Sequence, residues 1–227
     1  MRSHPDIINP GELMDKLRIP DTRRVFASIY NNVLLTTDVT PIRSILVCSA
    51  DEGEGATTVA VGLALAAAEQ QTGPVLLIDG NFRKPGVLAA FGQKDLYGLG
   101  EIMAGKMEAG CAISATAAPN LWVMGAGAAQ HNNVMKLEFP SFMNFLQKLS
   151  ALYALVLVDG PAVNTCPESV LFASQVDRVF LVVHAGETRV PVVEAALSKL
   201  AANGCDKVEL VLNRRIFPIP QWIYKKL

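Results

Sequence analysis

The sequence has few of the residues that build disulfide scaffolds or zinc sites. Only four of its 227 residues are cysteines, and none are paired as C-x-x-C. We therefore expect free thiols in a reducing compartment. The three histidines do not have the spacing of a metal-binding motif such as H-E-x-x-H. The sequence thus predicts neither a disulfide framework nor a zinc centre.

An excess of charge of one sign and a long apolar run are also missing. Twenty Lys and Arg against 21 Asp and Glu give a formal net charge of −1, whereas nucleic-acid-binding domains usually carry a strong basic excess. The longest apolar run, Val59–Ala68, is far shorter than the ~20 residues that span a bilayer. The first residues do not have the pattern of a signal peptide. We expect a soluble, cytoplasmic protein with no transmembrane segment and no nucleic-acid partner.

What is abundant is apolar sequence, because 51% of the residues are hydrophobic and only 18% are charged. This composition excludes disorder for most of the chain. Short segments that are apolar throughout alternate with patterns of helical period, which indicates strands buried on both faces of a parallel sheet. We predict an α/β fold: a doubly wound, mainly parallel sheet with helices on both faces. The predicted strands are 45–48, 75–78, 121–124, 155–158, 179–183 and 208–212.

The pattern also predicts how the chain is divided. Residues 1–21 are weakly periodic and are interpreted as an N-terminal arm or linker, residues 22–215 as the domain, and residues 216–227 as a C-terminal tail. In parallel sheets the ligand lies beyond the carboxyl ends of the strands. Polar residues follow several predicted strands, so we expect them to meet at one rim: Ser49, Asp79, Asp159 and Asn213.

The most informative stretch is residues 49–58, Ser-Ala-Asp-Glu-Gly-Glu-Gly-Ala-Thr-Thr, between a predicted strand and a predicted helix. A glycine-containing loop at a helix N-terminus is typical of phosphate binding. Against the P-loop pattern G-x-x-x-x-G-K-[ST], Gly55 and Thr57 match. Ala50 replaces the first glycine, and Ala56 stands where the lysine belongs.

The altered loop has an unfavourable charge for a triphosphate. Ala56 cannot neutralise phosphate, and Asp51, Glu52 and Glu54 add carboxylates to the same loop. Two unit charges ~4 Å apart interact by about 4 kcal/mol at an effective dielectric constant near 20. A helix N-terminus alone offers only about 0.3–1 kcal/mol. The loop is therefore expected to bind triphosphate poorly.

Two other interpretations of the glycines stay open. Gly53-Glu-Gly55 follows a strand, and Asp79 is near the position of a ribose-binding acid, as in dinucleotide-binding folds. Gly125-Ala-Gly127 follows another strand, but neither segment has its third small residue in place. The alternative is that these loops bind no ligand.

Several segments together make the chain resemble the cytoplasmic P-loop domain of bacterial tyrosine kinases (BY-kinases) of capsular and exopolysaccharide synthesis, in the MinD/ParA-like branch of P-loop ATPases. The resemblance extends from about Arg23 to the end, and Asp79-x-x-x-Arg-Lys-Pro is its most specific part. The segments are Gly53-Glu-Gly55, Leu76–Pro85, Leu155–Pro161 and Val211–Arg214.

The resemblance implies roles for particular residues, with ATP or ADP and Mg²⁺ as cofactors. Asp79 would belong to a second Walker-type motif that helps with Mg²⁺ and the attacking hydroxyl. Asp159 would be the Walker B acid, Thr57 would bind Mg²⁺ directly, and Asn213 would contact adenine. The nucleotide-binding set would be Gly53, Glu54, Gly55, Ala56, Thr57, Thr58, Arg83 and Asn213.

The chain also departs from that family. The lysine is Ala56, the second Asp of D-x-D is Asn81, and Arg24, Ala27 and Tyr30 stand where the ring-assembly motif E-x-x-R-x-x-R should fall. The C-terminal tyrosine cluster is reduced to Tyr224. These losses predict a pseudo-enzyme with catalytic positions that are vestigial.

Three hypotheses about function follow. The first is a pseudokinase regulator with weak or no ATP binding, which docks on a membrane-bound polysaccharide copolymerase or an active kinase homologue. The second is a working ATPase or autokinase in which Arg83 or Lys84 replaces the lysine. The third is a MinD/ParA-like positioning ATPase, which is disfavoured because Asp51 replaces that branch's early lysine. The aromatic tail would either pack on the domain or act as a docking or inner-membrane surface element.

Overall fold

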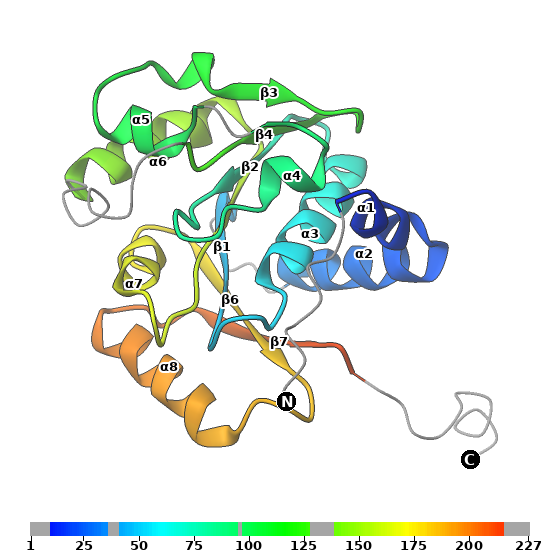
Figure 1. The fold of residues 1–227 in the computed structure, drawn as a ribbon, viewed down its shortest axis with the longest axis vertical. Coiled ribbons are helices and arrows are strands. Elements are labelled where there is room, and N and C mark those ends of the chain that lie inside the picture. Colours follow the sequence, from blue (N-terminus) through cyan, green and yellow to red (C-terminus); the bar gives the residue numbers. More distant parts are fainter. Residues whose placement is uncertain (1–9, 36–40, 95–96, 128–138, 216–227) are drawn as a thin grey trace.

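The computed structural model describes residues 10–35, 41–94, 97–127 and 139–215. Their strands form one seven-stranded sheet in the order β3-β4-β2-β5-β1-β6-β7, with every neighbouring pair parallel except β3–β4. The predicted α/β fold with a mainly parallel sheet is therefore confirmed (Figure 1). The strands are β1 Ser44–Ser49, β2 Val75–Asp79, β3 Ile113–Ala115, β4 Leu121–Met124, β5 Leu155–Asp159, β6 Arg178–His184 and β7 Val208–Asn213.

Helices cover both faces of the sheet because alternate strand residues enter two separate cores. In β1, Ile45 and Val47 pack with α3, whereas Leu46 and Cys48 pack in the cluster on the opposite face. One face carries α1 Pro10–Arg18, α2 Pro20–Leu35, α3 Ala56–Gln70 and α4 Val87–Ala90. The other carries α5 Leu99–Met103, α6 Phe139–Leu152, α7 Pro167–Ala173 and α8 Val190–Ala202. A short 3₁₀ helix, Ala109–Cys111, precedes β3.

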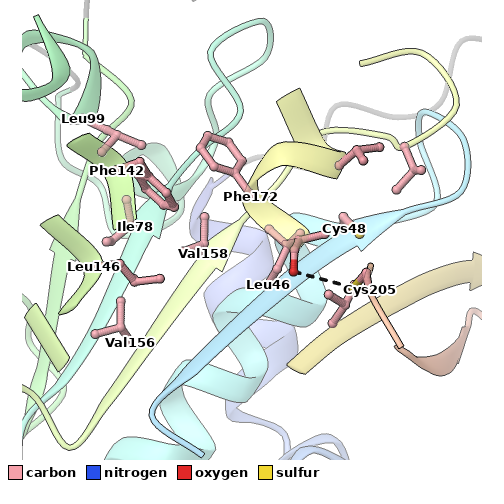
Figure 2. Close-up of a cluster of buried hydrophobic side chains, with 14 of the residues drawn as sticks. Leu46, Cys48, Ile78, Leu99, Phe142, Leu146, Val156, Val158, Phe172 and Cys205 are labelled. Atoms are coloured by element: carbon pink, nitrogen blue, oxygen red, sulfur yellow. Dashed lines mark hydrogen bonds between the residues drawn. The ribbon is translucent and has the colours of Figure 1, made fainter. Parts of the chain in front are cut away.

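The core on the α6–α7 face is closed by aromatic side chains. Figure 2 shows Phe142 of α6 and Phe172 of α7 facing each other above β5, with ring centroids 4.8 Å apart. Tilted aromatic pairs at this separation are favourable beyond the area they bury. This packing holds α7 against the carboxyl end of β5, where the candidate site lies.

The expected N-terminal arm contains a helix that packs on the domain. Leu13 and Leu17 of α1 are buried in the same core as α3 and α4. Next to α1, α2 lies against α3, and an ideal Cβ placed on Gly62 of α3 would meet the Phe26 ring at 2.5 Å. The absent side chain at Gly62 thus permits this close contact. The tail 216–227 lies outside the described residues, and the domain boundaries stay predictions.

The second glycine segment, Gly125–Gly127, has a packing role. The backbone N–H groups of Leu99 and Gly100 donate to the carbonyls of Gly125 and Ala126, both at 2.9 Å. A Cβ on Gly98 would lie 2.0 Å from the Gly125 oxygen. These contacts attach α5 to the end of β4. Among the described residues, the helices are all too short or too polar to span a bilayer.

Candidate functional site

The loop between β1 and α3 has a backbone shape that requires glycine. Gly53 and Gly55 have φ values of 82° and 91°, in the left-handed region that residues with a side chain rarely adopt. Gly55 is the residue before α3, and a Cβ there would lie 2.3 Å from the amide nitrogen of Asn213. Both its conformation and its contact with β7 therefore depend on glycine.

Two neighbouring strands hold this loop in place. The buried Glu54 carboxylate accepts a hydrogen bond from the Asp51 N–H at 2.9 Å and another from the Thr188 hydroxyl. The Thr188 oxygen also accepts from the N–H of His184, the last residue of β6, at 3.0 Å. Asn213 Nδ2 of β7 donates to the Glu54 carbonyl at 2.8 Å. The predicted ligand residues Glu54 and Asn213 thus bond within the chain.

The end of the loop and the first turn of α3 present a row of free hydrogen-bond donors. Among the described residues, the backbone N–H groups of residues 53–57 donate no hydrogen bond. The 15-residue helix α3 adds the partial positive charge of its N-terminus. A loop of free N–H groups at such a terminus is suited to an anion.

The second feature of the site is a fully buried carboxylate at the end of β5. Asp159 is 0% exposed, and neither carboxylate oxygen has a hydrogen-bond partner. Burial raises the pKa of Asp159 well above its ordinary value. The charge of Asp79 raises this pKa further, and the nearby Thr57 hydroxyl lowers it in part. Buried, unpartnered oxygens beside a hydroxyl are the kind of ligands that Mg²⁺ binds.

Asp79 lies directly beside Asp159 but is bonded quite differently. The two residues are register partners in the β2–β5 pairing. Asp79 Oδ2 accepts from the N–H groups of Gly86 at 2.7 Å and Val87 at 2.9 Å, and Oδ1 accepts from the Asn81 N–H at 3.0 Å. Asp79 therefore stabilises the loop from β2 to α4, whereas Asp159 has unsatisfied oxygens.

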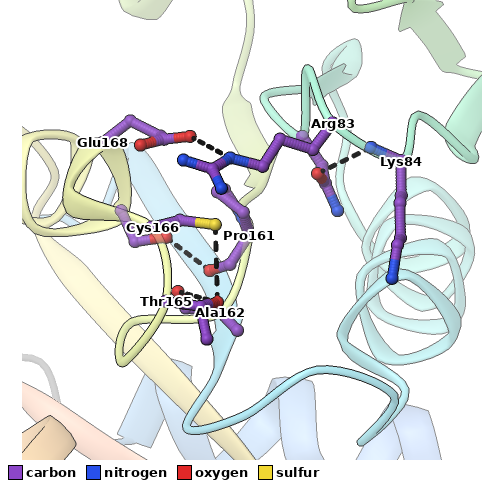
Figure 3. Close-up of polar contacts among 9 residues, drawn as sticks. Arg83, Lys84, Pro161, Ala162, Thr165, Cys166 and Glu168 are labelled. Atoms are coloured by element: carbon purple, nitrogen blue, oxygen red, sulfur yellow. Dashed lines mark hydrogen bonds and ion pairs between the residues drawn. The ribbon is translucent and has the colours of Figure 1, made fainter. Parts of the chain in front are cut away.

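The cations proposed to replace the missing lysine are both paired. Arg83 Nε lies 3.2 Å from Glu168 Oε1 of α7, and Lys84 Nζ lies 2.5 Å from Glu52 Oε2 in the phosphate loop. Figure 3 shows the two side chains pointing away from each other. Ala56, at the lysine position, is 9% exposed and ends in a methyl group. In this arrangement, each cation faces a carboxylate that offsets part of its charge.

Sequence reasoning missed a pocket at the ends of β6 and β7. This cavity of about 400 Å³ is lined by His184, Ala185, Gly186, Glu187 and Arg215. His184 and Asn213 are register partners, so the pocket adjoins the loop anchors described above. The only sequence signal for it was that these residues follow predicted strands.

The structure brings the residues predicted from the sequence to one rim of the sheet. The loop 53–58, Asp79, Asp159 and Asn213 all lie at the carboxyl ends of β1, β2, β5 and β7. Their roles toward a nucleotide stay predictions. Among the described residues, no group of three or more His, Cys, Asp or Glu side chains could hold a metal ion by itself. Mg²⁺ sites that depend on substrate phosphates do not need such a cage.

Curated proteins similar to this chain are tyrosine kinases. Tyrosine-protein kinase CpsD of Streptococcus pneumoniae serotype 4 is 25% identical over 199 residues, which cover 86% of each chain. Tyrosine-protein kinase YwqD of Bacillus subtilis is 28% identical over 180 residues, 79% of this chain and 75% of that protein. Tyrosine-protein kinase Wzc of Salmonella typhimurium is 29% identical over 208 residues, 90% of this chain but 27% of that longer protein. No family model matches the chain.

Solved structures give the same relationship. The chimerical protein CapA2B2 has a TM-score of 0.82 and 26% identity, covering 90% of this chain and 89% of its own. The kinase domain of VpsO has a TM-score of 0.77 and 28% identity, covering 89% and 99%. MinD of Pyrococcus horikoshii, solved with Mg-ADP, has a TM-score of 0.64 at 21% identity, covering 81% and 76%, and so shows the fold alone. The chain is therefore similar in sequence and structure to bacterial tyrosine kinases, as the resemblance in its motifs predicts, and it has a MinD-like P-loop fold.

Proposed function

We propose that the chain is a pseudokinase regulator of exopolysaccharide or capsule synthesis and export. The observation that carries the proposal is Ala56 at the start of α3, together with ion pairs that engage both Arg83 and Lys84. Phosphoryl transfer depends on positioning and on stabilising charge at the phosphates. A site that keeps the loop but lacks the cation is therefore suited to binding rather than turnover.

Part of the site fits a Mg-nucleotide and part does not. The free N–H groups of residues 53–57 suit phosphate oxygens, and Asp159 with Thr57 would hold Mg²⁺. Bound Mg²⁺ would supply charge neutralisation at the phosphates. The pocket lined by His184 and Arg215 would take the base. The lysine contact has no counterpart in Ala56, so we derive no transfer step.

We propose that the partner is a membrane-bound copolymerase or an active homologous kinase. Support for this comes from the match to tyrosine-protein kinase Wzc, in which the aligned region makes up 27% of the length. The C-terminal residues, which include Trp222, Tyr224 and two lysines, would contact that partner or the membrane surface.

Two assays on the purified full chain test the proposal. Phosphate release and phosphotyrosine formation with Mg-ATP are expected at the background set by the Asp159→Asn variant. Turnover in the wild-type chain that Asp159→Asn removes would overturn the pseudokinase proposal. In the second assay, the chain is expected to co-purify with a copolymerase whose cytoplasmic segments are intact but not with one whose segments are deleted. Equal recovery with both would contradict docking.

A further inference from the structure

The two ends of the candidate phosphate site are unequal. The inner end combines the free N–H groups of residues 53–57 with the buried, unpartnered Asp159. Asp159 is the register partner of Val47 near the end of β1, the strand that leads into the loop, and the Thr57 hydroxyl in the first turn of α3 lowers its pKa. The carboxylate therefore lies close to the same helix terminus. In P-loops the backbone donors hold the α- and β-phosphates. This end of the site retains donors for both.

The outer end has lost its attractive contacts. A P-loop lysine reaches the β- and γ-phosphates, but the Ala56 side chain ends at a methyl group. The neighbouring cations are held by carboxylates, Lys84 by Glu52 and Arg83 by Glu168. Of these four side chains Glu52 belongs to the loop itself, so its charge offsets that of Lys84 at this end of the site.

We infer that this site binds a Mg-bound nucleoside diphosphate in preference to the triphosphate. The inference rests on the proposed function, because it treats the site as one that binds without turnover. A γ-phosphate finds no further hydrogen-bond donor in this site. Its negative charge would also lie next to the loop carboxylates, and this repulsion is unfavourable. At an effective dielectric constant near 20, repulsion between a γ-phosphate and a single nearby loop carboxylate is large enough to lower affinity about tenfold or more.

Calorimetric titration of the full chain with Mg-ADP, Mg-ATP and AMP tests the inference, with ligand-induced change in melting temperature as a second readout. Mg-ADP is expected to bind at least about tenfold more tightly than Mg-ATP. The variant Ala56→Lys is expected to abolish this preference. Ala56→Met, which adds length without charge, is expected to keep the wild-type ordering. Circular dichroism would check that both variants fold.

The possible outcomes separate this inference from the proposed function. Mg-ATP binding as tightly as Mg-ADP, without phosphate release, would overturn the diphosphate preference alone. If none of the nucleotides binds, the diphosphate preference is likewise overturned, and the pseudokinase proposal is not. If Ala56→Met abolishes the preference for Mg-ADP as fully as Ala56→Lys does, the argument from charge is refuted. Hydrolysis of Mg-ATP by the wild-type chain would instead overturn the pseudokinase proposal.

Discussion

Replacing Asp159 by asparagine is expected to stabilise the fold, and the gain is expected to grow with pH. Asp159 is 0% exposed and its oxygens have no hydrogen-bond partner. Burial, with the charge of Asp79, raises its pKa well above the ordinary value. The ionised form is thus penalised in the folded state but not in the unfolded chain. Asparagine keeps the shape of the side chain and removes the charge.

The sign and size of the effect follow from proton linkage. Between the ordinary pKa of an aspartic acid, about 3.9, and the raised pKa of Asp159, the folded chain binds more protons than the unfolded chain. The free energy of unfolding of the wild type therefore falls as pH rises through this window, by at most about 1.4 kcal/mol per pH unit. The asparagine variant lacks this loss. The gain expected near neutral pH is therefore set by linkage: about 1.4 kcal/mol for each pH unit between the ordinary pKa and whichever is lower, the working pH or the raised pKa.

Urea denaturation of both chains at a series of pH values, without Mg²⁺, measures this difference. The matched control is Asp79→Asn in the adjacent strand. Asp79 accepts three backbone hydrogen bonds. Asparagine replaces one of the two acceptor oxygens by an NH2 group, so Asp79→Asn is expected to destabilise the fold by about 1–3 kcal/mol. The reasoning is refuted if Asp159→Asn destabilises the chain, or if its advantage over the wild type does not change with pH.

Two further substitutions test the anchoring of the site and the packing of the sheet edge. Thr188→Val removes a hydrogen-bond donor from the buried Glu54 carboxylate and is expected to lower the free energy of unfolding, measured by urea denaturation, by about 1–3 kcal/mol. An unchanged denaturation midpoint would contradict the role of Thr188 as a loop anchor. Gly98→Ala places a Cβ 2.0 Å from the Gly125 oxygen, whereas nothing lies within 4 Å of a Cβ on Gly110. Thermal melting should therefore drop clearly for Gly98→Ala and little for Gly110→Ala, and equal melting temperatures would count against the close contact.

The sheet was predictable from the sequence because its signal is local. A strand buried on both faces must be apolar at consecutive positions, and Leu155–Val158 and Val179–Val183 are apolar throughout. The antiparallel strand β3 was not foreseen because its residues Ile113–Ala115 are partly exposed, so they carry no such pattern. The helix α1 was missed because burying only Leu13 and Leu17 produces a weak periodicity in a polar segment.

The place of the candidate residues in the fold was predictable, whereas their bonding was not. Parallel strands bring their carboxyl ends to one edge, so the sequence alone places Asp79 and Asp159 at the same rim, and the pairing of β2 with β5 makes them neighbours. Which of the two is satisfied depends on the N–H groups of Gly86 and Val87, and these are positioned by the fold of α4. Likewise, the burial of the Glu54 side chain depends on a hydrogen bond from Thr188, which is far from it in the sequence.

The loop retains what fixes its shape and has lost what gives a P-loop its charge. Gly53 and Gly55 keep their left-handed conformations, and Asn213 still bonds to the loop backbone. Asn81, in place of an acid, donates to Asp79 and accepts from the Lys84 N–H, so it supports the turn without a negative charge. Shape depends on backbone bonds that alanine and asparagine at these positions preserve, whereas catalysis of phosphoryl transfer depends on charge. This is why a chain can keep the fold of the VpsO kinase domain at a TM-score of 0.77 while Ala56 leaves no cation at the lysine position.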